Sequence, residues 1–399
     1  MSLSGRPNLL LPEVRQNPYP LYAELRRNAP VCQVDPGGWA VSRYDDVLYV
    51  LKNPRLFSSE GLRFAAEPPW FGRSNPWCDS LVLKDPPVHG RLRGLVSRAF
   101  GTSLLTRLEP SIRATSEELT TGILERRTVD FVKDFALPLP ASVIGALLGL
   151  ESSLHSHFKK WSDDIAALSA SRPEDTELLA SVRRSVDEME RYLQEVLERR
   201  RREPGDDMIS DLLRAQVDGE SLTNTELMGF FFILLIAGLE TTLNLLSSSA
   251  WVLASNPELL ARLRADRSLI PQFIEEVLRY EPPIQASVRL CTEDVVVGGV
   301  PLLKGSLVYV LLGSALRDEA RFPDAERFDM DRNGTENLAF GHGIHFCLGA
   351  QLARLEARVA LEVLLARVSG LSPRSEQIEW MPSVTVRGLK SLPIEVRPA

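Results

Sequence analysis

Phe340-Gly-His-Gly-Ile-His-Phe-Cys-Leu-Gly349 is the most informative stretch of this chain, and a segment with amphipathic helical spacing, Leu348 to Val368, follows directly. Its three glycines let the backbone turn tightly around the thiol of Cys347. Backbone amides near a helix N-terminus can donate hydrogen bonds to the sulfur and so favour the thiolate form. The stretch therefore predicts a cysteine held for ligation at the start of a helix.

The residue types in this loop leave other interpretations open. A lone cysteine is most often an inert buried side chain. His342, His345 and Cys347 lie close enough in sequence to suit zinc, although no matching Cys/His group stands elsewhere. A dinucleotide-binding loop is disfavoured, because Gly341-His-Gly343 lacks the third glycine and no strand-like run precedes it.

The loop resembles the haem-binding signature of the cytochromes P-450, FxxGxHxCxG, at every fixed position. The resemblance implies that Cys347 ligates the iron of haem b (iron protoporphyrin IX) as a thiolate, with His345 at a haem propionate. Phe340 and Gly349 would be the signature's other cofactor-binding residues. The resemblance also implies one mainly α domain with a minor β part over residues 1–399. The haem would lie between an oxygen-groove helix and the cysteine-loop helix.

Composition is that of a folded globular chain, because 44% of its 399 residues are hydrophobic and 25% are charged. The net charge of -7 argues against binding nucleic acid. Four widely spaced cysteines suit a reducing cytoplasm. The first twenty residues hold only a short apolar run, so we expect no membrane anchor, and we expect a monomer.

Helical patterns dominate the chain. The apolar run 227–239 is too short to span a bilayer, and Thr223-Asn-Thr-Glu226 before it is a capping box, so we predict a buried helix. Asn256-Pro257 predicts another helix start, and a helix should run from Pro271 to Tyr280. Hairpins are expected in 31–41 and 295–310. The amphipathic segment after the cysteine carries Arg354, Glu356 and Arg358 among its apolar positions.

The apolar run ends in Ala237-Gly-Leu-Glu-Thr-Thr242. Small residues permit the close approach of something flat, and an adjacent acid and hydroxyl can open the helical hydrogen-bond ladder to water. Read alone, Glu240 and Thr241 would mark where a helix reaches solvent. By the resemblance this is the oxygen-activation groove, with Ala237 beside the haem. Thr241 would hold a water or a peroxide, and Glu240 would relay protons.

Glu276-Val-Leu-Arg279 places an acid and a base at i,i+3 on one helix face. A solvated helical pair is the usual explanation of this spacing. By the resemblance Glu276 and Arg279 lock the scaffold behind the cysteine loop, with Arg327 from Phe322-Pro-Asp-Ala-Glu-Arg-Phe328 completing a triad.

Asp85-Pro-Pro-Val-His89-Gly-Arg-Leu-Arg93 puts a histidine and an arginine at i,i+4, a sensible clamp for a carboxylate. The resemblance implies that His89, Arg93 and Arg289 bind the haem propionates. It also implies separate electron donors, a ferredoxin or flavodoxin with its NAD(P)H reductase. A local basic patch to receive them would comprise Arg91, Arg98, Arg354 and Arg358.

The predicted activity is insertion of one atom of dioxygen, by hydroxylation or epoxidation, into a bulky hydrophobic molecule such as a polyketide, macrolide or terpenoid. A fatty-acid hydroxylase, a peroxide-using peroxygenase and a non-catalytic haem sensor are the alternatives. Aromatic residues in the loop 61–80, including Trp77, either grip substrate or pack the loop onto the core. The predicted pocket residues are Phe64, Trp70, Phe71, Ile233, Ile236, Gln285 and Val386.

Overall fold

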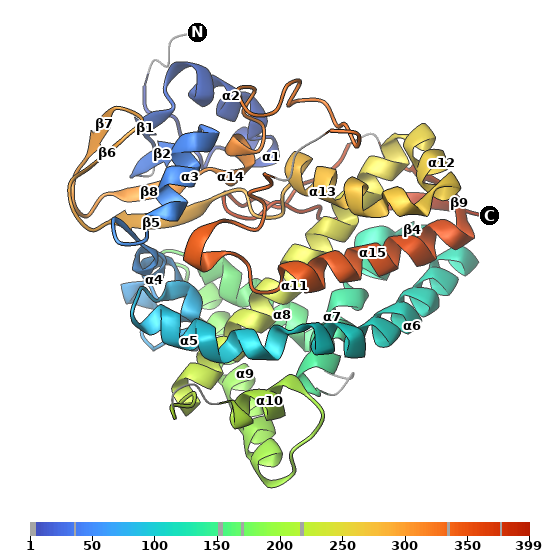
Figure 1. The fold of residues 1–399 in the computed structure, drawn as a ribbon, viewed down its shortest axis with the longest axis horizontal. Coiled ribbons are helices and arrows are strands. Elements are labelled where there is room, and N and C mark those ends of the chain that lie inside the picture. The colour runs from blue at the N-terminus through green and yellow to red at the C-terminus, as the bar shows by residue number, and fades with distance from the viewer. Residues whose placement is uncertain are drawn as a thin grey trace. The chain divides into compact units, whose positions relative to one another are not determined.

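The computed structural model describes residues 5–35, 37–150, 155–168, 171–215, 219–332, 336–375 and 377–399 (Figure 1). The chain forms two compact units. The first comprises Met1–Ser58, Arg113–Leu137 and Thr241–Ala399, and the second comprises Ser59–Ile112 and Pro138–Glu240. Two long helices, α6 (Thr102–Arg126) and α11 (Asn224–Ser255), contribute residues to both units.

The first unit contains the strands. Its largest sheet has the order β1-β2-β8-β5-β3, in which β2 and β8 are parallel and the other neighbours antiparallel. The hairpin predicted in 31–41 is the antiparallel pair β1 and β2, and that in 295–310 is the pair β6 and β7 with β8 after it. The bounds are β1 Val31–Gln33, β2 Trp39–Val41, β3 Phe57–Ser58, β4 Thr128–Asp130, β5 Ser287–Cys291, β6 Val295–Val297, β7 Val300–Leu302, β8 Leu307–Val310, β9 Val368–Pro373 and β10 Pro393–Pro398. Strands β4, β10 and β9 form a second, antiparallel sheet.

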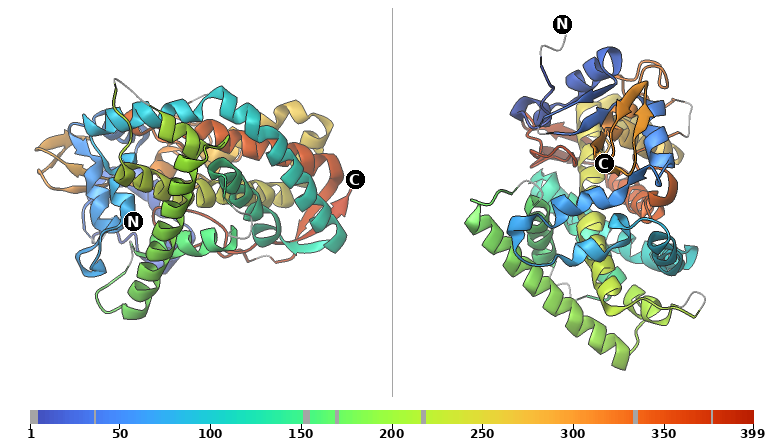
Figure 2. Two further views of the ribbon diagram at one scale, coloured as in Figure 1. Left: turned by 90° about the horizontal axis from the view of Figure 1, so that it is seen from below. Right: turned by 90° about the vertical axis from the view of Figure 1, so that its left-hand side faces the viewer.

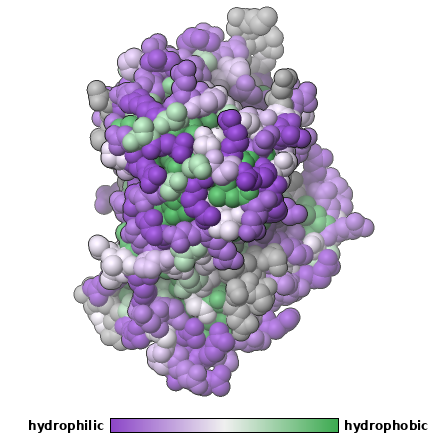
Figure 3. Space-filling view, turned by 90° about the vertical axis from the view of Figure 1, so that its right-hand side faces the viewer, coloured by the Kyte–Doolittle hydropathy of each residue, from purple (hydrophilic) through white to green (hydrophobic). Residues whose placement is uncertain are grey.

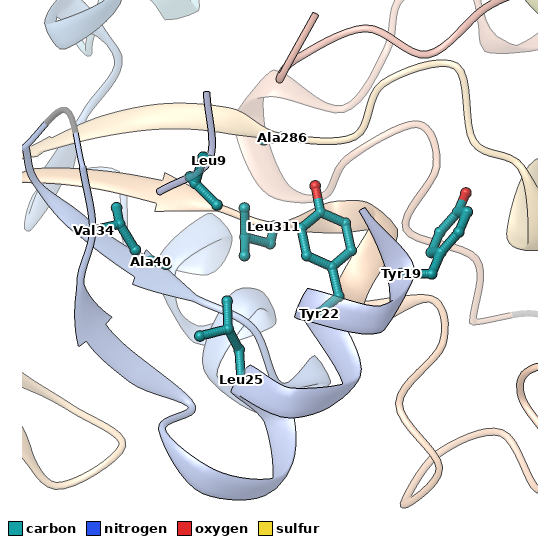
Figure 4. Packing of buried hydrophobic residues seen from close by; sticks show 8 residues of the cluster. All are labelled: Leu9, Tyr19, Tyr22, Leu25, Val34, Ala40, Ala286 and Leu311. Atoms are coloured by element: carbon teal, nitrogen blue, oxygen red, sulfur yellow. The ribbon is translucent and has the colours of Figure 1, made fainter. Parts of the chain in front are cut away.

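A hydrophobic core joins the start of the chain to the large sheet (Figure 4). Leu25 and Leu311 are fully buried there, and Tyr22 is 2% exposed. Apolar side chains at these spacings pack one face of helix α2 against the strands. The cluster comprises Leu9, Tyr19, Tyr22, Leu25, Val34, Ala40, Ala286 and Leu311.

Helices α12 (Pro257–Ala265) and α13 (Ile270–Tyr280) both pack against α15 (Ala350–Arg367) in the first unit. The last two confirm the predicted helices within two residues at each end. Asn256 precedes α12 as predicted, but its side chain bonds back to the Val252 carbonyl instead of capping the new helix. The other α-helices of this unit are α1 Pro12–Gln16, α2 Tyr19–Asn28, α3 Tyr44–Lys52 and α14 Leu312–Ala315.

The second unit is helical in its described residues. Helix α8 packs against α7 and α9, and α10 packs against both of these. Helix α9 is the long green helix in the right-hand view of Figure 2. The bounds are α4 Arg63–Ala66, α5 Val88–Ser97, α7 Pro138–Leu148, α8 His155–Ala167, α9 Thr176–Arg202 and α10 Met208–Arg214.

Helix α11 begins at the predicted capping box. The Glu226 amide donates to Thr223 Oγ1 at 3.2 Å, and the Thr223 amide donates to a Glu226 carboxylate oxygen at 2.9 Å. The helix is long and apolar enough to cross a membrane, yet 61% of its most apolar window is buried inside the protein. Burial on this scale fits the predicted core helix. Figure 3 shows a face of the molecule on which hydrophilic side chains predominate, as expected where helices turn their apolar sides inward.

Candidate functional site

The cysteine loop turns tightly just before α15, where the ribbon is orange-red in Figure 1. Gly341 and Gly343 have positive φ values of 71° and 73°, which side chains other than glycine rarely adopt. A Cβ atom on Gly343 would also lie 2.6 Å from the carbonyl oxygen of Leu51. The loop closes through the Cys347 amide, which donates to the Phe340 carbonyl at 2.9 Å. Glycine is therefore required at position 343 by both conformation and space.

Cys347 presents an exposed thiol from this loop. Cys78 differs, because burial, followed by the charge of Glu67, raises the pKa of its thiol to about 12. Burial also raises the pKa of Cys32 and Cys291. Among the described residues, no group of three His, Cys, Asp or Glu side chains is placed to hold a metal ion, which disfavours the zinc alternative. Of the four cysteines, Cys347 is the exposed one.

Arg354 of α15 connects the cysteine loop to helix α13. Its guanidinium lies 4.4 Å from the centre of the Phe340 ring, within cation–π range. The same group donates to the Glu275 carboxylate at 2.6 and 3.1 Å. Asn337 donates to the Glu275 carbonyl at 3.0 Å. Helix α13 therefore fixes both the loop and the first turns of α15.

Glu276 and Arg279 form the predicted ion pair, and both are buried. Two hydrogen bonds of 2.7 Å join the guanidinium to the carboxylate. Arg279 also donates to the carbonyls of Leu316, Ala325 and Arg327 at 2.9–3.1 Å. The solvated-pair explanation is thus wrong, because this pair ties α13 to the segment before the cysteine loop.

The triad prediction for Arg327 needs correction. Its side chain is 67% exposed and pairs with Asp329, and only its carbonyl oxygen contacts Arg279. The arginine near Glu276 is Arg332, with Nε 3.7 Å from the carboxylate and a side chain 12% exposed. Sequence offers no signal to choose between these arginines, because both follow the same turn-rich segment.

Arg289 and His345 belong to the same unit as Cys347. Arg289 lies on β5, is 7% exposed, and donates to two neutral oxygens, Ser287 Oγ at 2.8 Å and the Val288 carbonyl at 2.9 Å. His345 is half-buried and ends a short 3₁₀ turn, Gly343–His345. A buried guanidinium is a side chain that suits an anionic ligand such as a carboxylate.

In the second unit, His89 and Arg93 lie one turn apart on α5. His89 is 3% exposed, and burial, followed by the charge of Arg93, lowers its pKa. A neutral imidazole can still donate one hydrogen bond, and the half-buried Arg93 supplies the charge. Helix α5 continues through Gly90, so the glycine does not break it.

The motif at residues 237–242 lies within α11. Ala237 is exposed, although Leu235 and Leu239 beside it are 2% and 1% exposed. A Cβ at Gly238 would lie 2.5 Å from Ile144 Cδ1, the flexible end of a side chain on α7.

Glu240 and Thr241 follow on the same helix and are both half-buried. Burial raises the pKa of the Glu240 carboxyl, opposed by Lys159 and reinforced by Asp163, which form an ion pair on α8. An acid with a raised pKa can carry a proton closer to neutral pH. Glu240 therefore has the property that a proton relay needs.

The predicted pocket residues divide into several groups. Ile233 and Ile236 are each 9% exposed, and Val386 is half-buried in a β-bridge with Ile284. Phe71 is fully buried, and Trp70 donates to Ser171 Oγ at 3.0 Å, which supports the packing alternative for the aromatic loop. Trp77 also packs against a buried cluster. The side chain of Phe64 lies outside the described residues.

Gln285 requires correction as a pocket residue. It is 2% exposed, and its amide nitrogen donates to the Pro282 carbonyl at 3.0 Å and to the Tyr19 hydroxyl at 3.3 Å. A Cβ on Gly313 would clash with its amide oxygen. The side chain is therefore packed into the N-terminal core.

Three arginines of the predicted basic patch have carboxylate partners. Arg91 pairs with Glu226 and Arg358 with Glu362, while Arg354 is held by Glu275. The glutamates partly neutralise the charges of Arg91, Arg354 and Arg358. Arg98 is exposed.

Glu356 is a buried acid that the amphipathic pattern placed among the polar residues of α15. It is 2% exposed, and burial raises its pKa from 4.5 to about 8. The sequence spacing indicates the burial of Glu356, because position 356 lies one turn from the apolar Leu352 and Val359 on the same helix face.

Stability should depend on pH through Glu356. Its folded pKa of about 8 lies above the ordinary 4.5, so the folded protein binds more protons than the unfolded chain between these values. The free energy of unfolding should therefore fall as pH rises through this interval, by at most ~1.4 kcal/mol per unit. Glu356→Gln should reduce the slope in urea unfolding at pH 5 to 8. An identical slope in the variant would show that Glu356 does not titrate this way.

The fold and the cysteine loop define a haem-thiolate enzyme. The chain belongs to the cytochrome P450 family, whose model matches residues 41–394. It is 39% identical to cytochrome P450 109 of Bacillus spizizenii over 95% of this chain and 92% of the relative. It is 36% identical to 6-deoxyerythronolide B hydroxylase of Saccharopolyspora erythraea, over 95% and 96%. The crystal structure of CYP109E1 from Bacillus megaterium in complex with testosterone matches with a TM-score of 0.87 and 38% identity, over 96% and 99%.

The protein is thus a cytochrome P450 monooxygenase with the P450 fold, and its cofactor is protoporphyrin IX haem. The donor set fits this group. A thiol is presented by a glycine loop, and the two histidines and two arginines described above are the residue types that bind carboxylates.

Proposed function

We propose that Cys347 is the thiolate ligand of the haem iron, and that His345, Arg289, His89 and Arg93 bind the propionates. The exposure of Cys347 and the burial of Arg289 support these roles. Phe340 and Gly349 would shape the loop, because the Phe340 carbonyl and the Gly349 carbonyl accept hydrogen bonds from Cys347 and Ala353.

Bound haem supplies reductive activation of dioxygen and transfer of one oxygen atom to the substrate. The protein's own groups would deliver protons and exclude side reactions. Thr241 would hold a water with its hydroxyl, and Glu240 would pass protons from solvent toward it. The raised pKa of Glu240 supports this assignment. Proton delivery serves reductive dioxygen chemistry and so favours a monooxygenase over a peroxygenase or a passive sensor.

The proposed substrate is a bulky hydrophobic molecule such as a polyketide, macrolide or terpenoid, oxidised by hydroxylation or epoxidation. The observation that carries this proposal is the small side chain of Ala237, which lies on the same helix as the apolar Ile233 and Ile236 and leaves room for a bulky molecule. One relative is named for 6-deoxyerythronolide B, and another was solved with testosterone, a rigid hydrophobic molecule. A fatty acid is the second candidate for the same apolar lining.

Bacterial P450 enzymes generally take electrons from a ferredoxin and its reductase. We propose the same arrangement here, with a ferredoxin or flavodoxin and an NAD(P)H reductase. We also propose a cytoplasmic monomer, which fits the four free cysteine thiols.

A compound panel read by absorption spectroscopy tests the substrate proposal. A true substrate should displace iron-bound water and shift the spin state of the ferric haem. Macrolides and terpenoids are expected to produce the shift at lower concentrations than fatty acids of equal carbon number. The reverse order would favour the fatty-acid hydroxylase.

Paired variants of α11 should separate the two proton-delivery roles. Thr241→Ala is expected to bind substrate and consume reductant, but to release hydrogen peroxide instead of product, because nothing holds the water in place. Glu240→Gln should slow turnover by roughly 10²-fold, the lower range for loss of acid–base catalysis, with an altered solvent isotope effect. The measurement is product and peroxide formed per NAD(P)H consumed, with a surrogate ferredoxin system.

Thr242→Ser is a matched control, because Thr242 is the buried neighbour of Thr241. It should keep the coupling of the parent enzyme. Unchanged coupling in Thr241→Ala together with unchanged turnover in Glu240→Gln would remove the proton-delivery assignment.

A further inference from the structure

Helix α11 touches the backbone of a distant segment at Gly229, which is buried. A Cβ atom there would lie 2.7 Å from the carbonyl carbon of Asp79, 2.8 Å from the amide nitrogen of Ser80 and 2.9 Å from the carbonyl oxygen of Pro76. Carbon atoms that are not bonded prefer a separation of about 3.5–4.0 Å, so a side chain does not fit between the helix and the segment. The contact is therefore one of backbone against backbone, and it requires glycine at position 229.

The segment at this contact, Pro76–Ser80, is a compact 3₁₀ turn with its C-cap residue. Asn75 is 1% exposed and precedes the turn, where its side-chain oxygen accepts from the Trp77 amide at 3.2 Å. The Cys78 amide donates to the Asn75 carbonyl, and the Ser80 amide donates to the Trp77 carbonyl, both at 2.9 Å. Because these bonds hold the turn together, a side chain at position 229 would displace it as a unit.

The preceding part of the loop is held by helix α9 instead. Arg183 donates to the carbonyls of Phe71 and Trp70 at 2.8 and 3.3 Å. Arg73 pairs with Glu190 at 2.6 Å. Flexible arginine side chains make these contacts, and none of them involves α11. The displacement would therefore fall mainly on the segment that touches α11.

The contact lies on the face of α11 that carries the proposed substrate pocket. Gly229, Ile233, Ile236 and Ala237 follow the spacing i, i+4, i+7 and i+8, which places them on one side of the helix. Gly229 is at the N-terminal end of this face, about 12 Å along the helix axis from Ala237. The segment Pro76–Ser80 therefore covers the end of the face that is farther from Ala237.

We propose that Gly229 is a positioning residue that determines specificity. Its missing side chain lets Pro76–Ser80 lie against α11 as the end wall of the substrate pocket, and the wall limits the length of the substrate along the helix. This inference rests on the proposed function, in which Ile233 and Ile236 line that pocket. A larger residue at position 229 would push the wall outward and lengthen the pocket, without changing any residue assigned to the haem.

A series of 1-alkylimidazoles tests the position of the wall, because the ring nitrogen binds ferric haem iron and the alkyl chain extends into the pocket. In the parent holoenzyme, affinity should rise with each added methylene group until the chain meets the wall. Gly229→Ala should move this limit to longer chains. The first member beyond the parent's limit should bind the variant roughly fourfold more tightly, the gain for one more buried methylene group. The measurement is the Soret shift on titration, and 1-methylimidazole should bind both proteins equally.

Gly122→Ala is the matched control, because Gly122 also lies within a helix, α6, and a Cβ there would make an ordinary contact of 3.8 Å with Arg126. It should keep the parent's limit. An unchanged limit in Gly229→Ala would overturn the proposal. An equal loss of affinity for every member would also overturn it, because a merely structural role predicts that result.

Ile233→Phe separates this inference from the proposed function. A larger side chain on the pocket face should move the limit to shorter chains. If neither Ile233→Phe nor Gly229→Ala changes the limit, the assignment of the pocket to this face of α11 is wrong. If Ile233→Phe shortens the limit and Gly229→Ala leaves it unchanged, only the role of Gly229 is wrong.

Amide hydrogen exchange of the parent holoenzyme provides a test that does not depend on the folding of a variant. Alkyl chains long enough to reach the wall should change the exchange rate of peptides that cover Pro76–Ser80, whereas 1-methylimidazole should not. The same exchange rate with every member of the series would overturn the proposal.

Discussion

Reduced protein exposed to carbon monoxide is expected to show the strongly red-shifted Soret band of thiolate ligation, and Cys347→Ala is expected to lose that band completely. The thiolate donates electron density to the iron, and alanine has no atom that can replace it. The backbone amide of Cys347 closes the turn on Phe340, and alanine keeps that amide. The variant should therefore fold. Absorption spectra of the reduced, carbon monoxide-bound proteins make the measurement.

Cys32→Ala is the matched control, since Cys32 is a half-buried thiol on β1. It should keep the full red-shifted band. Retention of the band in Cys347→Ala would show that another residue binds the iron. Purified protein that contains zinc and no haem would contradict the whole assignment.

Glu276→Ala is expected to lower the free energy of unfolding by ~3–5 kcal/mol, because it leaves the Arg279 charge buried without its carboxylate. The side chains are 5% and 3% exposed, so water cannot compensate. Arg279 holds three carbonyls in the segment before the cysteine loop, so haem content should fall as well. Urea unfolding and the haem-to-protein ratio of the purified variant make the measurement.

Arg327→Ala tests the corrected triad in the same assay. Its guanidinium is 67% exposed, so stability should change by no more than ~0.5 kcal/mol. A decrease in the free energy of unfolding as large as that expected for Glu276→Ala would show that Arg327 does stabilise the scaffold. Full stability and full haem content in Glu276→Ala would instead show that the buried pair is dispensable.

Several features of the fold could be predicted because short segments determine them. The capping box at Thr223 and Glu226 involves residues three apart, and the structure forms both of its hydrogen bonds. Proline and apolar spacing likewise fixed α13 within one residue. The requirement for glycine at position 343 was visible as a glycine-rich turn, although its cause, the Leu51 carbonyl, lies almost three hundred residues earlier.

The errors concern side chains whose position depends on distant parts of the chain. Arg327 and Arg332 have the same charge and similar surroundings in sequence, and only the packing around Glu276 distinguishes them. Gln285 is held by Tyr19, which is 266 residues away. The ion pairs of Arg91 with Glu226 and of Arg354 with Glu275 likewise join residues far apart in the sequence. Sequence spacing carries no information on such long-range contacts.

The large sheet also constrains how the protein can be made. Strand β2 ends at Val41, but its parallel neighbour β8 begins at Leu307. At a synthesis rate of about 5–20 residues per second, roughly 13–50 seconds pass on the ribosome before the second strand is complete. During that time the β1–β2 hairpin has an unprotected edge that can pair with other nascent chains. The order of strands in this sheet therefore means that the edge of β2 is paired only after most of the chain has been made.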